Sequence, residues 1–340
     1  MKRVSCLSCL LLLAGIALLV SCTGKRQETA TDAVPELFSR PDLSDITRQI
    51  NDHPQRADLY FQRGNILHHL QQDSLAVADF KTAIRYDSSK AEYYSAIGEL
   101  LFEHKDITGS VPWFQKAIAR NPEDPRAHLK FAKMLIYTRD YPKAFSEINT
   151  VLRQDIYNPE GYFLKGMIYK DLKDTGKAIS SFQTVLNAAP EYKEALIQLG
   201  QLYAAKGDPL ALRYYENAFR LDTGDVFPLF AKGVFFQQQG QPEKAKQQYR
   251  ECVLRDHQYA DAYYNLAFIY LGQDSVEKAF RHFDLLTKIT PNDAEAYYNR
   301  GICNERLGRK DAAAGDFRQA LVFDPDYTEA KEALKRTEKH

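Results

Sequence analysis

Cysteine, methionine and tryptophan are scarce in this chain of 340 residues. It has five cysteines, three methionines and one tryptophan. Three of the cysteines fall within the first 22 residues, which leaves only Cys252 and Cys303 in the body of the chain. So few cysteines exclude a disulfide-stapled scaffold, and we expect these two thiols to act as small packing residues.

An excess of charge of either sign is also missing, since Lys plus Arg and Asp plus Glu both number 45. Proteins that bind nucleic acid carry a basic face or stripe, so this balance argues against a nucleic-acid partner. Long apolar runs are absent as well. The longest, Leu10 to Val20, has eleven residues, whereas a helix that spans a bilayer needs about 20.

Motifs that carry chemistry are not found. The sequence has no glycine loop that would cradle a phosphate, no Gly-x-Ser-x-Gly elbow and no His-Glu-x-x-His. His68 and His69 are adjacent, so they would point in different directions from a helix, which argues against a shared metal ion. We therefore expect a protein that is not an enzyme and uses no cofactor, metal or small-molecule substrate.

What the sequence does contain is a periodic pattern. Its cleanest copy is residues 294–327, where two amphipathic segments are joined by a polar turn and end at Asp324-Pro325. A column of glycine or alanine recurs every 34 residues, with a single spacing of 33 between Gly200 and Gly233. Its members are Gly64, Gly98, Ala132, Gly166, Gly200, Gly233, Ala267 and Gly301.

Two further columns follow the first with the same period. One is small and lies at Ala76, Ser110, Ala144, Ala178, Ala211, Ala245, Ala279 and Ala313. The other is mostly aromatic and lies at Phe80, Phe114, Ile148, Phe182, Tyr215, Tyr249, Phe283 and Phe317. A small residue where two helices cross lets their axes approach until a neighbouring ring fills the gap, so each copy is predicted to be a tight helical hairpin.

This period and these columns resemble the tetratricopeptide repeat family. The resemblance covers eight consecutive copies, at residues 57–90, 91–124, 125–158, 159–192, 193–225, 226–259, 260–293 and 294–327. It implies an all-α fold, a right-handed α-solenoid of helix-turn-helix repeats. Residues 42–56 and 328–340 keep a helical period and are predicted to cap the two apolar ends of the array.

The N-terminal segment resembles that of an exported bacterial lipoprotein. A basic head precedes the apolar run, which ends in Leu19-Val20-Ser21-Cys22, a sequence similar to a lipobox. Residues 1–21 would then be a signal peptide, Cys22 the lipidated N-terminus and residues 22–41 a disordered tether. The alternative is an ordinary signal sequence with an incidental cysteine. By resemblance, the expected location is the periplasmic face of the outer membrane.

In the tetratricopeptide family the first helix of each hairpin lines a concave groove that binds a partner. The residues beside the small column in the later copies are aromatic or amide side chains, which suit an apolar peptide segment. They are Phe227, Phe230, Tyr264, Asn265, Phe268, Tyr298 and Asn299. Two alternatives remain: the rings are already buried by tight coiling or dimerisation, and the asparagines only reflect the repeat consensus.

A secondary candidate site is polar. Chaperone-binding members of the family clamp a terminal carboxylate, and Asn65, Arg126 and Lys130 match three of the five positions of that clamp, while Phe61 and Ala96 occupy the others. Lys133 extends this charged stretch. The mismatches favour the absence of a complete clamp.

Two functions fit these features. The first is a non-catalytic, lipid-anchored scaffold of the bacterial cell envelope that binds a protein or peptide partner in its groove. The second is an adaptor or regulator of a periplasmic protease or of envelope assembly. Both need the same groove. Ser74 and Ser275 also lie in Asp-Ser-aliphatic motifs that resemble an O-glycosylation acceptor.

Overall fold

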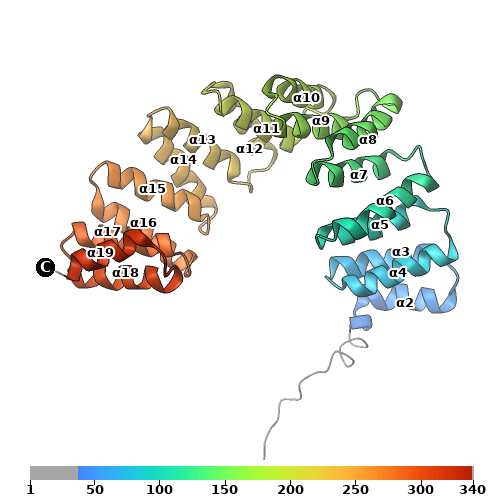
Figure 1. Ribbon diagram of the computed structural model, residues 1–340, viewed down its shortest axis with the longest axis horizontal. Helices are drawn as coiled ribbons and strands as arrows, with labels where there is room; N and C mark the ends of the chain where they lie inside the picture. Colours follow the sequence, from blue (N-terminus) through green and yellow to red (C-terminus); the bar gives the residue numbers. More distant parts are fainter. Residues whose placement is uncertain (1–36, 339–340) are drawn as a thin grey trace, which may run out of the picture. The chain divides into compact units, whose positions relative to one another are not determined.

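The computed structural model describes residues 37–338, in which every regular element is an α-helix (Figure 1). Helices α3 to α18 alternate along the chain as the first and second helices of the eight copies, and α3 with α4 and each pair from α7 with α8 to α17 with α18 pack as hairpins. The first helices are α3 (Ala57–His69), α5 (Ala91–Glu103), α7 (Pro125–Tyr137), α9 (Pro159–Asp171), α11 (Lys193–Ala204), α13 (Phe227–Gln238), α15 (Ala260–Gly272) and α17 (Ala294–Arg306). The second helices are α4 (Asp73–Tyr86), α6 (Ile107–Arg120), α8 (Tyr141–Gln154), α10 (Thr175–Ala188), α12 (Leu210–Leu221), α14 (Pro242–Arg255), α16 (Val276–Ile289) and α18 (Lys310–Phe323). The predicted all-α fold of repeated hairpins is confirmed.

The chain divides into two compact units, Met1–Leu100 and Leu101–His340, and the division falls within α5. In the first unit, α2 (Pro41–Asp52) packs against α3 and buries Leu43, Ile46 and Ile50. In the second unit, α19 (Thr328–Glu338) packs against α18 and buries Ala330 and Ala333. The predicted signal peptide, Cys22 and most of the tether lie outside the described residues.

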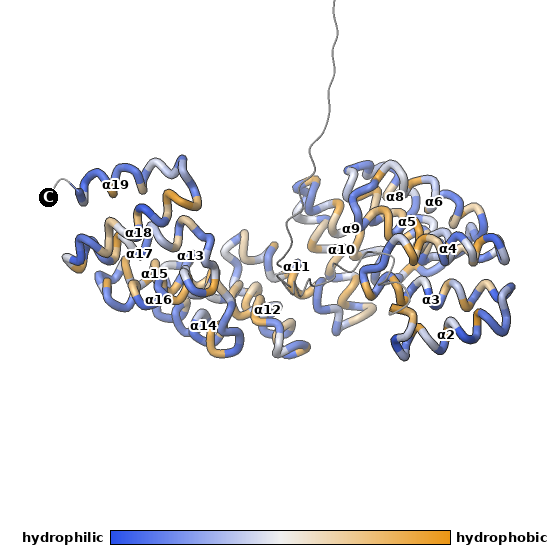
Figure 2. The backbone as a smooth tube through the Cα atoms, turned by 90° about the horizontal axis from the view of Figure 1, so that it is seen from below, coloured by the Kyte–Doolittle hydropathy of each residue, from blue (hydrophilic) through white to orange (hydrophobic). Residues whose placement is uncertain are grey.

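The helices begin where the sequence supplies a cap. Asp140, Asp174 and Asn158 each accept a hydrogen bond from a backbone N–H three residues later, which satisfies one of the free donors at a helix start. Pro125 and Pro159 occupy first helical positions, where a missing N–H costs nothing. Figure 2 shows the result, with apolar stretches inside the helices and hydrophilic turns between them.

Each hairpin turns at one residue in the left-handed backbone region, with φ between 53° and 74°. These residues recur with the period of the repeat and are Gln71, Lys105, Arg139, Lys173, Gly207, Gly240, Asp274 and Gly308. Only three are glycine, so the other five turns carry a local cost of about 1 to 2 kcal/mol. The turn also shows where the copy with the 33-residue spacing has lost a residue. From Gly207 to Ala211 there are four positions, whereas the equivalent residues of the preceding copy, Lys173 and Ala178, are five positions apart. The deletion lies at the start of α12.

Within a hairpin, the glycine of the first helix lies against the aromatic ring of the second. A Cβ atom at Gly200 would lie 2.5 Å from Cε1 of Tyr215, and one at Gly301 would lie 2.6 Å from Cε1 of Phe317. Neighbouring heavy atoms do not approach a real Cβ so closely. The ring therefore occupies the space that a side chain at the glycine would need, as the sequence predicted.

The copies with alanine in this column solve the same problem differently. Opposite Ala132 the companion is the aliphatic Ile148. Opposite Ala267 the companion is Phe283, whose ring lies at 86° to that of Tyr264, three residues before the alanine. The equivalent ring pairs of four glycine copies meet at 42° to 58°. The methyl group of the alanine is thus accommodated either by an aliphatic companion residue on the second helix or by a companion ring in a different orientation.

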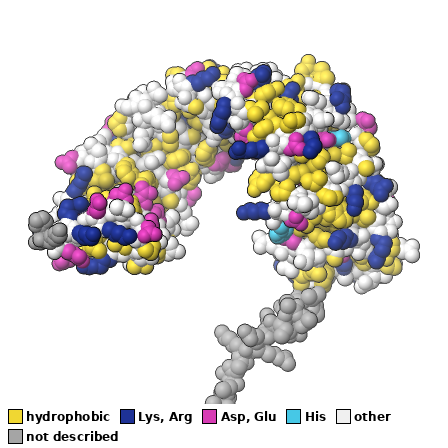
Figure 3. All heavy atoms as spheres, viewed as in Figure 1, with side chains coloured by type: hydrophobic (Ala, Val, Ile, Leu, Met, Phe, Trp, Pro, Cys, Tyr) yellow, Lys and Arg dark blue, Asp and Glu magenta, His cyan; other side chains and the backbone are white. Residues whose placement is uncertain are grey.

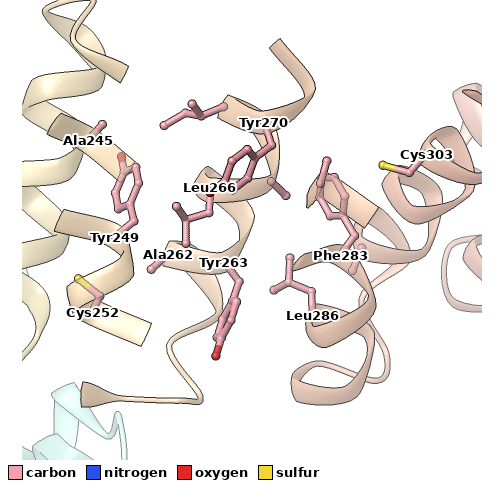
Figure 4. Close-up of a cluster of buried hydrophobic side chains, with 14 of the residues drawn as sticks. Ala245, Tyr249, Cys252, Ala262, Tyr263, Leu266, Tyr270, Phe283, Leu286 and Cys303 are labelled. Atoms are coloured by element: carbon pink, nitrogen blue, oxygen red, sulfur yellow. The ribbon is translucent and has the colours of Figure 1, made fainter. Parts of the chain in front are cut away.

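Side chains from neighbouring hairpins pack together in apolar clusters. Figure 4 shows the cluster in which Tyr249 of α14, Leu266 of α15 and Phe283 of α16 meet. Cys252 and Cys303 belong to it, and both are buried, free thiols whose pKa burial raises to about 12. Their predicted role in packing is confirmed.

Partly buried ion pairs tie the first and last copies to their neighbours. Arg63 of α3 donates to both carboxylate oxygens of Asp79 at 2.7 and 2.8 Å and to Thr47 of α2 at 3.3 Å. Arg300 of α17 donates to Asp316 of its own hairpin and to Asp284 of the preceding one, the latter at 2.8 Å. A planar guanidinium that serves two elements at once fixes the angle between them.

The glycine contact yields a stability prediction. Gly200→Ala should destabilise the array by about 1 to 3 kcal/mol, because the new methyl group overlaps the ring of Tyr215. Gly315→Ala is the matched control, since a Cβ at this helical glycine meets nothing within 4 Å, and it should stabilise α18 by about 0.5 to 1 kcal/mol. Thermal unfolding measures both, and equal midpoints for the two variants would contradict the packing described.

Candidate functional site

Two pairs of successive first helices in the second unit contact each other directly. Helix α7 packs against α9, and α11 packs against α13, in addition to the contacts within each hairpin. We use the name first-helix face for the side chains that flank the small column on the first helices of this unit. The candidate groove residues of the sequence lie on it.

An apolar pocket of 280 Å³ opens on this face between α11 and α13. Phe227 and Phe230, both predicted groove residues, lie in its wall. The remaining lining residues are Gln201, Ala204, Ala205, Tyr215, Ala231, Val234, Phe235 and Gln238. The structure thus brings two of the predicted residues together in a concave apolar site.

The pocket exists because one copy departs from the pattern of its neighbours. Ala204 and Ala205 end α11 with two methyl groups, whereas the equivalent positions of the preceding copy carry the longer Lys170 and Asp171. Short side chains at this point leave the ring of Phe230 uncovered from one side. The alanine pair is the signal in the sequence that could have located the pocket.

The aromatic candidates are packed more tightly than the sequence predicted. Phe230 is half-buried between Tyr249 and Tyr259, with ring centroids 5.7 and 5.4 Å apart. Tyr298 lies in the same way between Phe317 and Tyr327, at 5.9 and 5.0 Å. These rings serve the hairpin and its junction with the next copy, so only part of each ring faces solvent.

Tyr264 and Phe268 of α15 form a ring pair with centroids 4.6 Å apart. The Tyr264 hydroxyl donates to the Glu295 carboxylate of α17, and burial together with this acid raises the pKa of Tyr264. Phe268 is the most exposed of the candidate rings, at 39%. It is therefore the apolar side chain of this region that a partner could reach most easily.

The two asparagine candidates behave differently from each other. Asn299 was predicted to face a ligand, and this is wrong, since it is only 7% exposed and its amide donates to the Glu295 carbonyl of its own helix at 2.9 Å. The side-chain amide of Asn299 therefore bonds to the backbone of α17 and not to a ligand. The repeat pattern could not predict this hydrogen bond. Asn265 is half-buried and lies against the Tyr249 side chain.

The secondary candidate residues fall in different units. Asn65 is half-buried on α3 of the first unit, and the three cations lie on α7 of the second. Two of the cations are already paired within the chain, Arg126 with Asp124 at 3.4 Å and Lys133 with Glu160 at 2.8 Å. Lys130 is half-buried. These pairs leave less positive charge for a partner than the sequence suggested.

The far end of the second unit carries charges of both signs. Figure 3 shows acidic and basic side chains side by side over α17 to α19. Glu305 of α17 pairs there with Arg336 of α19 at 2.8 Å, and this pairing lowers the pKa of Glu305.

Buried histidine and metal chemistry offer no second site. His128 of α7 is buried, with Nδ1 at 2.5 Å from Glu147 and Nε2 at 2.9 Å from the Pro122 carbonyl. The hydrogen bond to Glu147 raises the pKa of His128, and this contact joins α7 to α8. Residues 37–338 contain no group of three side chains placed to hold a metal ion.

Comparison with known families identifies the repeat. Models of the tetratricopeptide repeat match residues 57–90 and 159–192, residues 74–125 and 230–294, and residues 266–337. These segments together cover more than half of the sequence. The chain therefore belongs to the tetratricopeptide repeat proteins.

Curated relatives are distant. DnaJ homolog subfamily C member 7 of Mus musculus is 24% identical over 288 residues, which are 79% of this chain and 56% of that protein. DnaJ protein P58IPK homolog of Arabidopsis thaliana is 26% identical over 165 residues, which are 45% of this chain and 34% of that protein. The chain spans from about a third to just over half of the length of these relatives.

Solved structures support the fold. The C-terminal part of a TPR repeat-containing protein from Cytophaga hutchinsonii has a TM-score of 0.56 and 19% identity, over 70% of this chain and 98% of that one. A tetratricopeptide repeat protein from Parabacteroides merdae has a TM-score of 0.50 and 17% identity, over 73% of this chain and 98% of that one. Repeats of this kind mediate contacts between proteins.

The packing of the rings leads to a prediction about their separate roles. Phe230→Ala should lower the unfolding midpoint clearly, because a ring held between two tyrosines is lost, and the cost should approach the roughly 3 to 5 kcal/mol of a core Phe→Ala change. Phe268→Ala should cost less than half as much, since its ring is partly in solvent. Urea unfolding of the two variants gives the comparison, and a larger loss for Phe268→Ala would reverse this assignment.

Proposed function

We propose that this protein is a non-catalytic scaffold that binds an extended segment of a partner protein across the first-helix face of α9 to α15. The observation that carries the proposal is the apolar pocket between α11 and α13. Exposed apolar concavities on soluble proteins usually mark interfaces, and a buried anchor at their centre supplies much of the binding free energy.

The size of the pocket suits a single side chain. Its volume of 280 Å³ lies just below the roughly 300 to 1,000 Å³ typical of small-molecule sites. Gln201 and Gln238 supply amide donors and acceptors in its lining, and these can pair with the backbone of an extended peptide. A large apolar residue of the partner would enter the pocket while its backbone follows the face.

The proposal also includes an envelope location with a lipid anchor at Cys22. What supports this is the sequence alone, namely the basic head, the short apolar run and the cysteine directly after Ser21. The described residues contain no helix long and apolar enough to cross a membrane. The acyl chains on Cys22 would hold the protein at the membrane, and the repeats that follow in the chain would bind the partner.

The pocket can be blocked without disturbing the core. Ala205 lines the pocket and is exposed at the end of α11, so Ala205→Trp should fill the space and lower partner recovery from envelope extracts at least tenfold. Ala188→Trp, at the exposed end of α10, is the matched control and should leave recovery unchanged. Quantitative mass spectrometry of the co-purified proteins makes the measurement, and equal recovery by the two variants would reject the pocket as the binding site.

The lipid anchor has its own test. Cys22→Ala should shift the protein from the membrane fraction to the soluble fraction and abolish incorporation of a labelled fatty acid, because no other acylation site is proposed. Cys9→Ala, a cysteine inside the predicted signal peptide, should change neither result. A Cys22→Ala protein that stays in the membrane fraction and keeps its label would remove the lipoprotein part of the proposal.

A further inference from the structure

A lysine with only neutral partners lies beside the pocket. Lys170 of α9 donates from Nζ to the side-chain oxygens of Gln198 and Gln201 on α11, at 2.5 and 2.9 Å. An ammonium group has three donors, so one N–H remains for a further acceptor. Among residues 37–338, no carboxylate lies within ion-pair distance of this amine.

Three other lysines with limited exposure in the second unit are paired with carboxylates. Lys193 pairs with Asp222 and Asp225 at 2.8 and 3.1 Å, and Lys232 pairs with Glu216 at 2.7 Å. Lys246, which is buried, pairs with Glu243 at 2.8 Å. Lys170, in contrast to these three residues, has amide oxygens as its hydrogen-bond partners.

The departure has an electrostatic consequence. Burial lowers the pKa of Lys170, and the charges that act on it are Asp171, which opposes this shift, and Lys173, which adds to it. The Asp171 carboxylate also accepts a hydrogen bond from Tyr141, at 3.3 Å. A partly desolvated cation without an opposite charge in contact is stabilised when an anion is added beside it.

Gln201 connects this cation to the pocket, because the same side chain accepts from Lys170 and lines the apolar cavity. Two side chains on one face of an extended peptide are separated by two residues and about 7 Å. A peptide with its apolar side chain in the pocket can therefore place a neighbouring side chain at the far side of Gln201. That side chain would meet Lys170.

We propose that the partner segment carries an aspartate or glutamate two residues from the large apolar residue that enters the pocket, and that its carboxylate pairs with Lys170. This inference rests on the proposed function and adds the chemistry of the ligand to it. Lys170 then selects among apolar segments, since a segment without the acid gains only the apolar contact. A segment with a basic residue at that position is rejected.

The test is selection of random peptides displayed on phage against the purified chain and against Lys170→Gln, in parallel. Glutamine keeps a donor for Gln198 and Gln201 but carries no charge. Lys244→Gln is the matched control, because it removes the same charge from α14, where the amine lies over the Phe236 ring. Circular dichroism and thermal unfolding establish that all three proteins are folded alike.

We expect the parent chain and Lys244→Gln to enrich peptides with Asp or Glu two residues from Leu, Ile, Phe, Met or Trp. Lys170→Gln should keep the apolar enrichment and lose the acidic one, and selected peptides should bind it at least fivefold more weakly. Apolar enrichment without an acid in the parent would overturn this inference and leave the proposed function standing. Failure of every protein to enrich any peptide would overturn the proposed function itself.

Discussion

The contact between a glycine Cα and an aromatic ring fixes the geometry of this array. It sets the distance between the two helices of a hairpin, and it recurs with Gly64 and Phe80, Gly166 and Phe182, and Gly200 and Tyr215. A packed interior transmits a change of one methyl group, so this distance is held within narrow limits. The copies with alanine meet the same limit with Ile148 or with a turned Phe283. Everything on the first-helix face is positioned by this spacing.

The groove is therefore not a row of free rings. Rings three residues before the small column pack on the companion ring and, in several copies, on a tyrosine at the start of the next hairpin. The apolar pocket lies at a copy that departs from the regular pattern. The hairpin of α11 and α12 is that copy, since it has alanines at 204 and 205 and has lost a residue at the start of α12.

The periodic residues made the fold predictable from the sequence. Phe227 and Phe230, which the sequence places in the groove, line the apolar pocket, and their contact with a partner stays a prediction. Asn299 was not, because whether an amide faces solvent or its own backbone depends on a rotamer and not on spacing. The role of Lys170 could not be predicted either, because it depends on which side chains of α11 lie across from it. The position of a residue in the repeat predicts on which side of its helix it lies. Its hydrogen bonds and ion pairs depend on the side chains of the adjacent hairpin.

Photo-cross-linking in the cell tests the central claim most directly, because it captures whichever protein is bound at the chosen position. A photoreactive phenylalanine derivative would replace Gln238, which lines the pocket at the end of α13 and is exposed, and in a second protein it would replace the equally exposed Gln247 of α14. If the partner binds at the first-helix face, a discrete adduct of higher mass is expected from position 238 and none from position 247. An adduct from position 247 without one from position 238 would place the partner on the second helices and contradict this account.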